Sequence, residues 1–98
     1  MSLKDEYDFD LLVNEGEELV IEELEKELSK AEYDKICKCQ DCILDMATLA
    51  LNNLKPAYRS SLTGRLYAAQ YHEGSYIKEV ETAVKTAIKK VSKNPSHD

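Results

Sequence analysis

The sequence lacks the long apolar runs and the catalytic motifs that define several large classes of protein. It has no run of about 18 or more apolar residues, and its first ten residues are rich in charge, so we expect neither a membrane span nor a signal peptide. We therefore expect a cytoplasmic location. Glycine-rich phosphate loops, nucleophile elbows, HExxH pairs and paired carboxylates are missing as well. The sequence therefore favours a protein that is not an enzyme.

Positive charge is scarce in the first half of the chain. Residues 1–45 carry fifteen acids and five bases, whereas residues 46–98 carry four acids and eight bases, which gives a net charge of -6. An acidic chain binds duplex DNA poorly, because nonspecific affinity depends on Lys and Arg side chains that neutralise phosphates. We expect the acidic first helix to lie beside the basic last helix, within a chain or across a dimer, although the basic half still allows a small anionic ligand.

The length and the 43% hydrophobic content suit one domain over residues 1–98. The fold class that we predict is mainly α, a compact helical domain. Apolar periodicity predicts three principal helices, at about residues 10–31, 40–53 and 75–92, with a short irregular or partly extended segment between the second and the third.

The first predicted helix has apolar residues near the 3.6-residue period and glutamates on its other face. Gly16 weakens its first third, because glycine inside a helix costs about 1 kcal/mol relative to alanine. The alternative is a regular helix that begins near Asn14, with residues 9–13 as a separately packed lead-in.

The second predicted helix is apolar nearly all round, which is typical of a helix in the middle of a domain. Its polar positions are Asp41, Asp45, Thr48 and Asn52, which recur at steps of four, three and four and therefore form one narrow stripe. We expect this stripe to face solvent, because buried carboxylates are costly unless they are paired. Pro56 follows shortly and ends the helix.

The third predicted helix begins at Ser75, which we take as its N-cap. Its apolar residues alternate at spacings of three and four: Ile77, Val80, Val84, Ala87 and Val91. This seam lasts only two heptads, too short for an independent coiled coil. The helix must therefore pack on its own domain or on the same helix of a second copy.

Three cysteines, Cys37, Cys39 and Cys42, form a C-x-C-x-x-C pattern at the start of the second helix. Their sulfurs can converge only if the first two lie in a turn and Cys42 projects back from the helix. A helix N-terminus favours the thiolate form, and soft thiolates suit zinc. The pattern predicts a zinc site; the alternatives are unmetallated thiols that pack, redox or sulfur chemistry, and an iron–sulfur cluster.

A structural zinc site is usually four-coordinate, so one ligand is missing from the local sequence. The candidates are His72, His97, Asp41, a solvent molecule, or a group from another chain. His72 has an alternative interpretation as an ordinary surface side chain.

The segment from Cys37 to Tyr58 resembles the late competence development protein ComFB family. The residues that carry the resemblance are the C-x-C-x-x-C pattern, Asp45, Ala47, Ala50-Leu51-Asn52, Leu54-x-Pro56-x-Tyr58 and, upstream, Asn14-x-x-Glu17-x-Leu19-Val20. Lys55 stands where family members tend to have the first of two prolines. We expect the likeness to cover about residues 14–58 and to fade beyond Tyr58.

The resemblance implies a small zinc-binding homodimer in the cytosol, an accessory or adaptor protein of the bacterial late competence system. It implies competence proteins as partners, among them a helicase-like DNA-uptake motor and a phosphoribosyltransferase-like protein, with zinc on the cysteines. Some relatives look like receptors for cyclic dinucleotides, so that role is the alternative function.

For a cyclic dinucleotide, the candidate ligand-binding residues are Tyr58, Arg59, Arg65 and Tyr67. Guanidinium groups can grip phosphates bidentately, and aromatic faces can stack on bases. The alternative is that these tyrosines pack in the protein and that the arginines are solvated charges.

Overall fold

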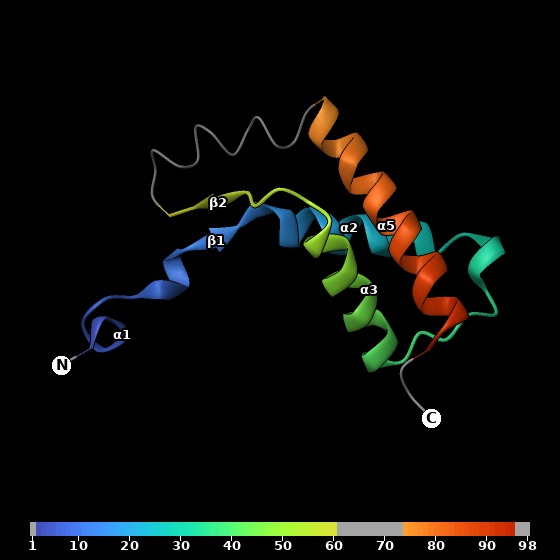
Figure 1. Cartoon of the computed structure of the whole chain (residues 1–98), viewed down its shortest axis with the longest axis horizontal. Helices are drawn as coiled ribbons and strands as arrows, with labels where there is room; N and C mark the ends of the chain where they lie inside the picture. Colours follow the sequence, from blue (N-terminus) through green and yellow to red (C-terminus); the bar gives the residue numbers. More distant parts are fainter. Residues whose placement is uncertain (1, 61–73, 96–98) are drawn as a thin grey trace.

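Three long helices and a small two-stranded sheet make up most of the described structure, a computed structural model that describes residues 2–60 and 74–95 (Figure 1). The elements in chain order are α1 (Leu3–Glu6), the 3-10 turn η1 (Phe9–Leu11), β1 (Val13–Asn14), α2 (Glu15–Leu28), the 3-10 turn η2 (Ala31–Tyr33), α3 (Gln40–Asn52), β2 (Tyr58–Arg59) and α5 (Ser75–Lys93). The prediction of a mainly helical fold with three principal helices is confirmed.

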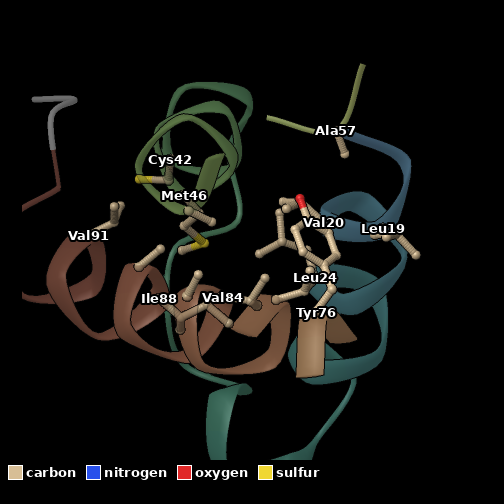
Figure 2. Close-up of a cluster of buried hydrophobic side chains, with 14 residues drawn as sticks. Leu19, Val20, Leu24, Cys42, Met46, Ala57, Tyr76, Val84, Ile88 and Val91 are labelled. Carbon is tan, nitrogen blue, oxygen red and sulfur yellow. The ribbon is translucent and has the colours of Figure 1, made fainter. Parts of the chain in front are cut away.

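The hydrophobic core lies where α2 and α3 both pack against α5 (Figure 2). Val20 of α2, Met46 of α3, and Val84 and Ile88 of α5 are completely buried. The predicted seam of α5 faces this core, so the helix packs on its own domain rather than depending on a second copy. The acidic α2 and the basic α5 also lie against each other within one chain, as expected.

The helix α2 begins at Glu15 and ends at Leu28, so the predicted span of 10–31 was too long at both ends. Asn14 caps the helix, with its side-chain oxygen accepting a hydrogen bond from the Gly16 N–H at 3.0 Å. The two residues before the helix are instead drawn into β1, which pairs antiparallel with β2 in the register Val13↔Arg59 and Asn14↔Tyr58.

The lead-in before β1 is separate, as predicted in the alternative, but it is not packed. Phe9, Leu11 and Leu12 are each about half exposed or more, at 49%, 61% and 49%. In Figure 1 this segment and α1 extend away from the three long helices.

A tight junction explains why glycine occurs in the first turn of α2. A Cβ atom on Gly16 would lie 3.0 Å from the Tyr76 hydroxyl oxygen and 3.1 Å from the Asn14 side-chain oxygen. The Tyr76 hydroxyl donates to the Lys55 carbonyl at 3.0 Å, and the Ala57 N–H donates to the same Asn14 oxygen at 3.1 Å. Gly16 therefore permits the close approach of α2, α5 and the chain that leads into β2.

The helix α3 keeps its predicted start at Gln40 and ends at Asn52, but only one of its faces is buried. Cys42, Met46 and Ala50 face the core, whereas Leu44 is 53% exposed. The helix is less buried than its nearly all-round apolar pattern indicated, because within the described residues it packs mainly against two helices, α2 and α5.

The polar stripe of α3 lies toward solvent as expected: Asp41, Thr48 and Asn52 are exposed, and Asp45 is half-buried. At the start of α5 the N-cap is Gly74, with φ at 63°, and Ser75 is already helical. The N-cap prediction was therefore one residue late. Within residues 2–60 and 74–95, no helix combines the length and the apolar character needed to cross a bilayer.

Candidate metal centre

The three cysteines come together where the loop after η2 enters α3. Cys37 lies in the loop, Cys39 is the N-cap of α3, and Cys42 lies in the first turn of the helix. Their Sγ atoms are all within 4.8 Å of one another. The turn before the helix thus provides the convergence that the spacing requires.

The loop that carries Cys37 is held against the core by its neighbours. The Lys38 ammonium donates to the Tyr33 carbonyl at 2.7 Å, and the Ile36 N–H donates to the same carbonyl at 3.4 Å. The side chains of Tyr33, Ile36 and Cys37 are partly buried against the hydrophobic cluster. The first sulfur is therefore positioned by packing as well as by the turn.

The sulfurs differ in their exposure to solvent. Cys42 is 1% exposed and points into the core from α3, where it joins the cluster that includes Met46 of the same helix and Val91 near the end of α5 (Figure 2). Cys37 is half-buried, and Cys39 is exposed. The cluster is thus anchored in the core at one side and open to solvent at the other.

The surroundings of the sulfurs shift two thiol pKa values in opposite directions. The backbone N–H of Cys42, and then the Cys37 side chain, lower the pKa of Cys39. Burial, and then the neighbouring Cys37 and Cys39 side chains, raise the pKa of Cys42 to about 12. Without a metal, Cys39 ionises more readily than Cys42, which remains protonated.

The cysteines fit a zinc ion in both spacing and chemistry. With Zn–S distances of about 2.3 Å and tetrahedral angles, ligand sulfurs lie about 3.8 Å apart. Sulfurs already within 4.8 Å of one another reach that spacing through small side-chain adjustments. Cys37, Cys39 and Cys42 could therefore supply three of the four ligands.

The fourth ligand is not part of this cluster among residues 2–60 and 74–95, where the grouped ligand atoms are the three sulfurs. Asp41 lies within the cysteine pattern but is exposed, and its carboxylate does not belong to the group. The candidates His72 and His97 lie outside the described residues. A solvent molecule or another chain stays a prediction.

The residues predicted to bind a cyclic dinucleotide are only partly described. Tyr58 is 59% exposed at the start of β2. Arg59 is engaged in an ion pair, through its Nε, with the Glu15 carboxylate. Arg65 and Tyr67 lie outside the described residues, so the assignment of this ligand site stays a prediction.

The pairing of Arg59 with Glu15 was not anticipated from the sequence. The Glu15 side chain is only 5% exposed, and the Arg59 side chain is 24% exposed. The two residues are 44 positions apart and meet because β1 pairs with β2. Only knowledge of that strand register could have revealed the pair.

A match over nearly the whole described structure assigns the family. Residues 13–95 fit the family model of late competence development protein ComFB. The chain belongs to the ComFB family. The expectation that the likeness ends near Tyr58 was wrong, because the family match continues through α5.

A solved structure supports this assignment. The structure of the late competence protein ComFB from Bacillus subtilis is similar to this chain with a TM-score of 0.67 and 26% sequence identity. The similarity covers 87% of this chain and 94% of that one. No curated protein matches this chain. Residues 2–12 precede the part that the ComFB family model matches.

Proposed function

We propose that this ComFB protein is a zinc-stabilised, non-enzymatic adaptor of the late competence system, which takes up DNA for transformation, and that it acts as a homodimer with other competence proteins as partners. The observation that carries the zinc assignment is the convergence of three cysteine sulfurs within 4.8 Å at the entry to α3. The competence role follows from membership of the ComFB family.

A structural role for the metal is favoured over a catalytic one by the position of the cluster. Cys42 is buried in the core beside α5, while Cys37 belongs to the loop after η2. A zinc ion bound to both would cross-link this loop to the packed helices. Metal binding and folding are then coupled, because the unfolded chain has no preformed site.

Thermal unfolding tests this role directly. We expect a chelator to lower the unfolding temperature, and added zinc to restore it. Cys42→Ser should show the low temperature with or without chelator. Gln40→Ser, at an exposed position between the cysteines, is the matched control and should respond to chelator as the wild type does. Equal unfolding temperatures with and without chelator would count against a structural metal.

The homodimer is proposed from the family resemblance, with an exposed apolar surface to support it. Leu12, directly before β1, and Tyr58, in β2, are 49% and 59% exposed at the sheet. A second copy that covers this end of the molecule would remove both side chains from water. The seam of α5 is used within the chain and gives the dimer no support.

Light scattering at micromolar concentration tests the dimer. The wild type should have the mass of two chains, and Leu12→Ser with Tyr58→Ser should shift it toward one. Ile21→Ser with Leu44→Ser, which changes equally exposed apolar residues on α2 and α3, is the control and should leave the mass unchanged. A monomeric wild type would contradict the proposal.

The competence role is tested in the source organism by deletion of the gene and measurement of transformation frequency. We expect a loss that the wild-type gene and Gln40→Ser restore and that Cys42→Ser does not. An unchanged frequency in the deletion strain would contradict the assignment to DNA uptake.

The cyclic dinucleotide role stays the second candidate, with the exposed Tyr58 ring as its only support among the described residues. Arg59 already pairs with the Glu15 carboxylate through its Nε, so a phosphate that it binds would lie beside that negative charge. Titration calorimetry with the two common cyclic dinucleotides decides the matter. Binding should also raise the unfolding temperature, and the absence of both heat and thermal shift would retire this role.

A further inference from the structure

An apolar groove of about 420 Å³ runs between α2 and α3 on the outside of the helices. Ile21 on α2 and Leu44 on α3 line it and are 52% and 53% exposed. Leu28 of α2 and Leu51 of α3 extend the apolar lining and are partly buried against the core. Two large aliphatic side chains left half in water beside a continuous apolar floor indicate an interaction surface.

The shape of the groove suits one helix of another protein. Its α2 wall is formed by residues spaced about one turn apart, from Glu17 to Leu28, and its α3 wall by residues from Ile43 to Leu51. A third helix laid between two such walls inserts apolar side chains at positions i, i+3 or i+4, and i+7. The α2 wall is about three turns long and the α3 wall about two, which is enough for that two-turn pattern.

The charge of the groove selects among the occupants that this shape allows. Glu17 and Glu25 line it on the α2 side, about 12 Å apart along the helix axis. Residues 15–28 carry seven glutamates and a single lysine, Lys26. An occupant with Lys or Arg residues two turns apart would therefore meet a negative rim over its full length.

The groove of a second copy and the segment 3–12 are two other possible occupants, and both fit the groove less well. Groove-to-groove packing of two copies would bring Glu17 and Glu25 of one α2 toward those of the other, which costs free energy through like-charge repulsion. The segment 3–12 is exposed and apolar but carries four acids and one base, so it has the wrong charge.

The helix α5 of a second copy has the right charge but the wrong surface. Lys85 and Lys89 are exposed on it, whereas its apolar side chains Val80, Val84 and Ile88 are buried in its own core. It therefore has no apolar anchors left to insert into the groove.

We propose that the groove between α2 and α3 is a docking site for a basic amphipathic helix of a partner protein. This inference rests on the proposed adaptor role, because an adaptor needs a surface that binds a partner protein. Zinc binding and dimerisation are measured separately, and their failure would leave the binding result interpretable.

The probe is a synthetic 14-residue helical peptide with leucines at positions 1, 4, 8 and 11 and lysines among the remaining positions. Two control peptides accompany it, one with the same composition in scrambled order and one with glutamate in place of every lysine. Fluorescence anisotropy at physiological salt measures binding to the purified full chain. We expect the patterned basic peptide to bind at least about tenfold more tightly than either control.

Protein variants locate the binding. Ile21→Ser with Leu44→Ser should weaken binding at least about tenfold, because both anchors lose apolar contact area. Glu17→Gln with Glu25→Gln should weaken it and reduce its salt dependence, without touching the core. Leu3→Ser, at 65% exposure outside the groove, is the matched control and should bind as the wild type does. Circular dichroism confirms that each variant is folded.

Four outcomes would overturn the proposal. The first is no binding of the patterned peptide at about 100 µM, a weak affinity for a three-turn helix. The second is equal binding of a control peptide: the scrambled one would show that charge attraction alone explains binding, and the acidic one that the groove does not select a basic helix. The third is unchanged affinity in both groove variants. The fourth is conversion of a wild-type dimer to a monomer by Ile21→Ser with Leu44→Ser, which would assign the groove to a second copy.

Discussion

Replacing Gly16 by alanine should lower the stability of this protein, although the same change in most helices raises it. Alanine gains about 1 kcal/mol over glycine in helix propensity. Here its Cβ would lie 3.0 Å from the Tyr76 hydroxyl oxygen and 3.1 Å from the Asn14 side-chain oxygen. Neither atom can move freely, because the hydroxyl donates a hydrogen bond to the Lys55 carbonyl and the Asn14 oxygen accepts hydrogen bonds from two backbone N–H groups.

The magnitude follows from these opposing effects. Overpacking of a fitted contact costs about 1–3 kcal/mol, and a strained hydrogen bond about 1 kcal/mol. After the gain in propensity is subtracted, the free energy of unfolding should fall by about 1–3 kcal/mol. For a domain of this size, such a loss lowers the unfolding temperature by roughly 4–24 °C.

A double-mutant cycle separates the contact from the propensity effect. Tyr76→Phe removes the hydroxyl, so Gly16→Ala in that background should cost less than in the wild type or raise stability. Thermal unfolding by circular dichroism measures all four proteins. A higher unfolding temperature for Gly16→Ala in the wild-type background would refute the close-approach explanation.

Three further changes probe the charges and the thiols. Arg59→Met should lower the free energy of unfolding by about 2 kcal/mol in chemical denaturation, because the nearly buried Glu15 carboxylate loses its guanidinium partner. Adding Glu15→Gln to the same chain should recover part of the loss. An unchanged denaturation midpoint in Arg59→Met would contradict this. Burial raises the pKa of Glu23, so the stability that this side chain contributes is present below its unfolded pKa and is lost as the pH rises through the folded pKa. Glu23→Gln should therefore raise the unfolding temperature at pH 7 and have no effect near pH 3. The opposite pH trend would be inconsistent with burial as the cause. In metal-free protein, mass spectrometry should find that iodoacetamide modifies Cys39 before Cys42. Hydrogen bonds lower the pKa of Cys39, whereas burial raises that of Cys42. Equal labelling rates of these two thiols would argue against this difference in their surroundings.

The sequence predicted those helix boundaries that depend on local signals. The helix α3 begins at Gln40 as expected, where the apolar periodicity starts, and α5 begins directly after Gly74, within one residue of the prediction. For α2 the sequence left two starts open, near residue 10 and near Asn14, and the structure has the second. Asn14 is fixed there partly by the Ala57 N–H, 43 residues away, and such long-range pairing leaves no local pattern.

The open face of α3 shows a second limit of periodicity. Leu44 contributes to an apolar pattern that is typical of an enclosed helix, yet it is 53% exposed. Hydrophobicity shows that a side chain favours burial, but it does not identify the molecule that buries it. The groove beside Leu44 is where that distinction matters for function.

The candidate site was anticipated in its members and in its geometry, but not in its environment. The spacing of Cys37, Cys39 and Cys42 required a turn before the helix, and the structure has it. Cys42 is buried in a cluster that also contains Val91 of α5, far along the chain, and such long-range packing leaves no local pattern. The same distance in sequence explains why the partner of Arg59 was missed.

Metal content of the purified protein tests the central claim most directly. The protein should be prepared without a metal-affinity tag, and its zinc measured by inductively coupled plasma mass spectrometry before and after chelation. We predict about one zinc per chain in the wild type and in Gln40→Ser, much less in Cys42→Ser, and a loss of helicity when chelation removes the metal. Less than about a tenth of an equivalent of zinc, with helicity unchanged by chelation, would contradict the account of a structural zinc centre.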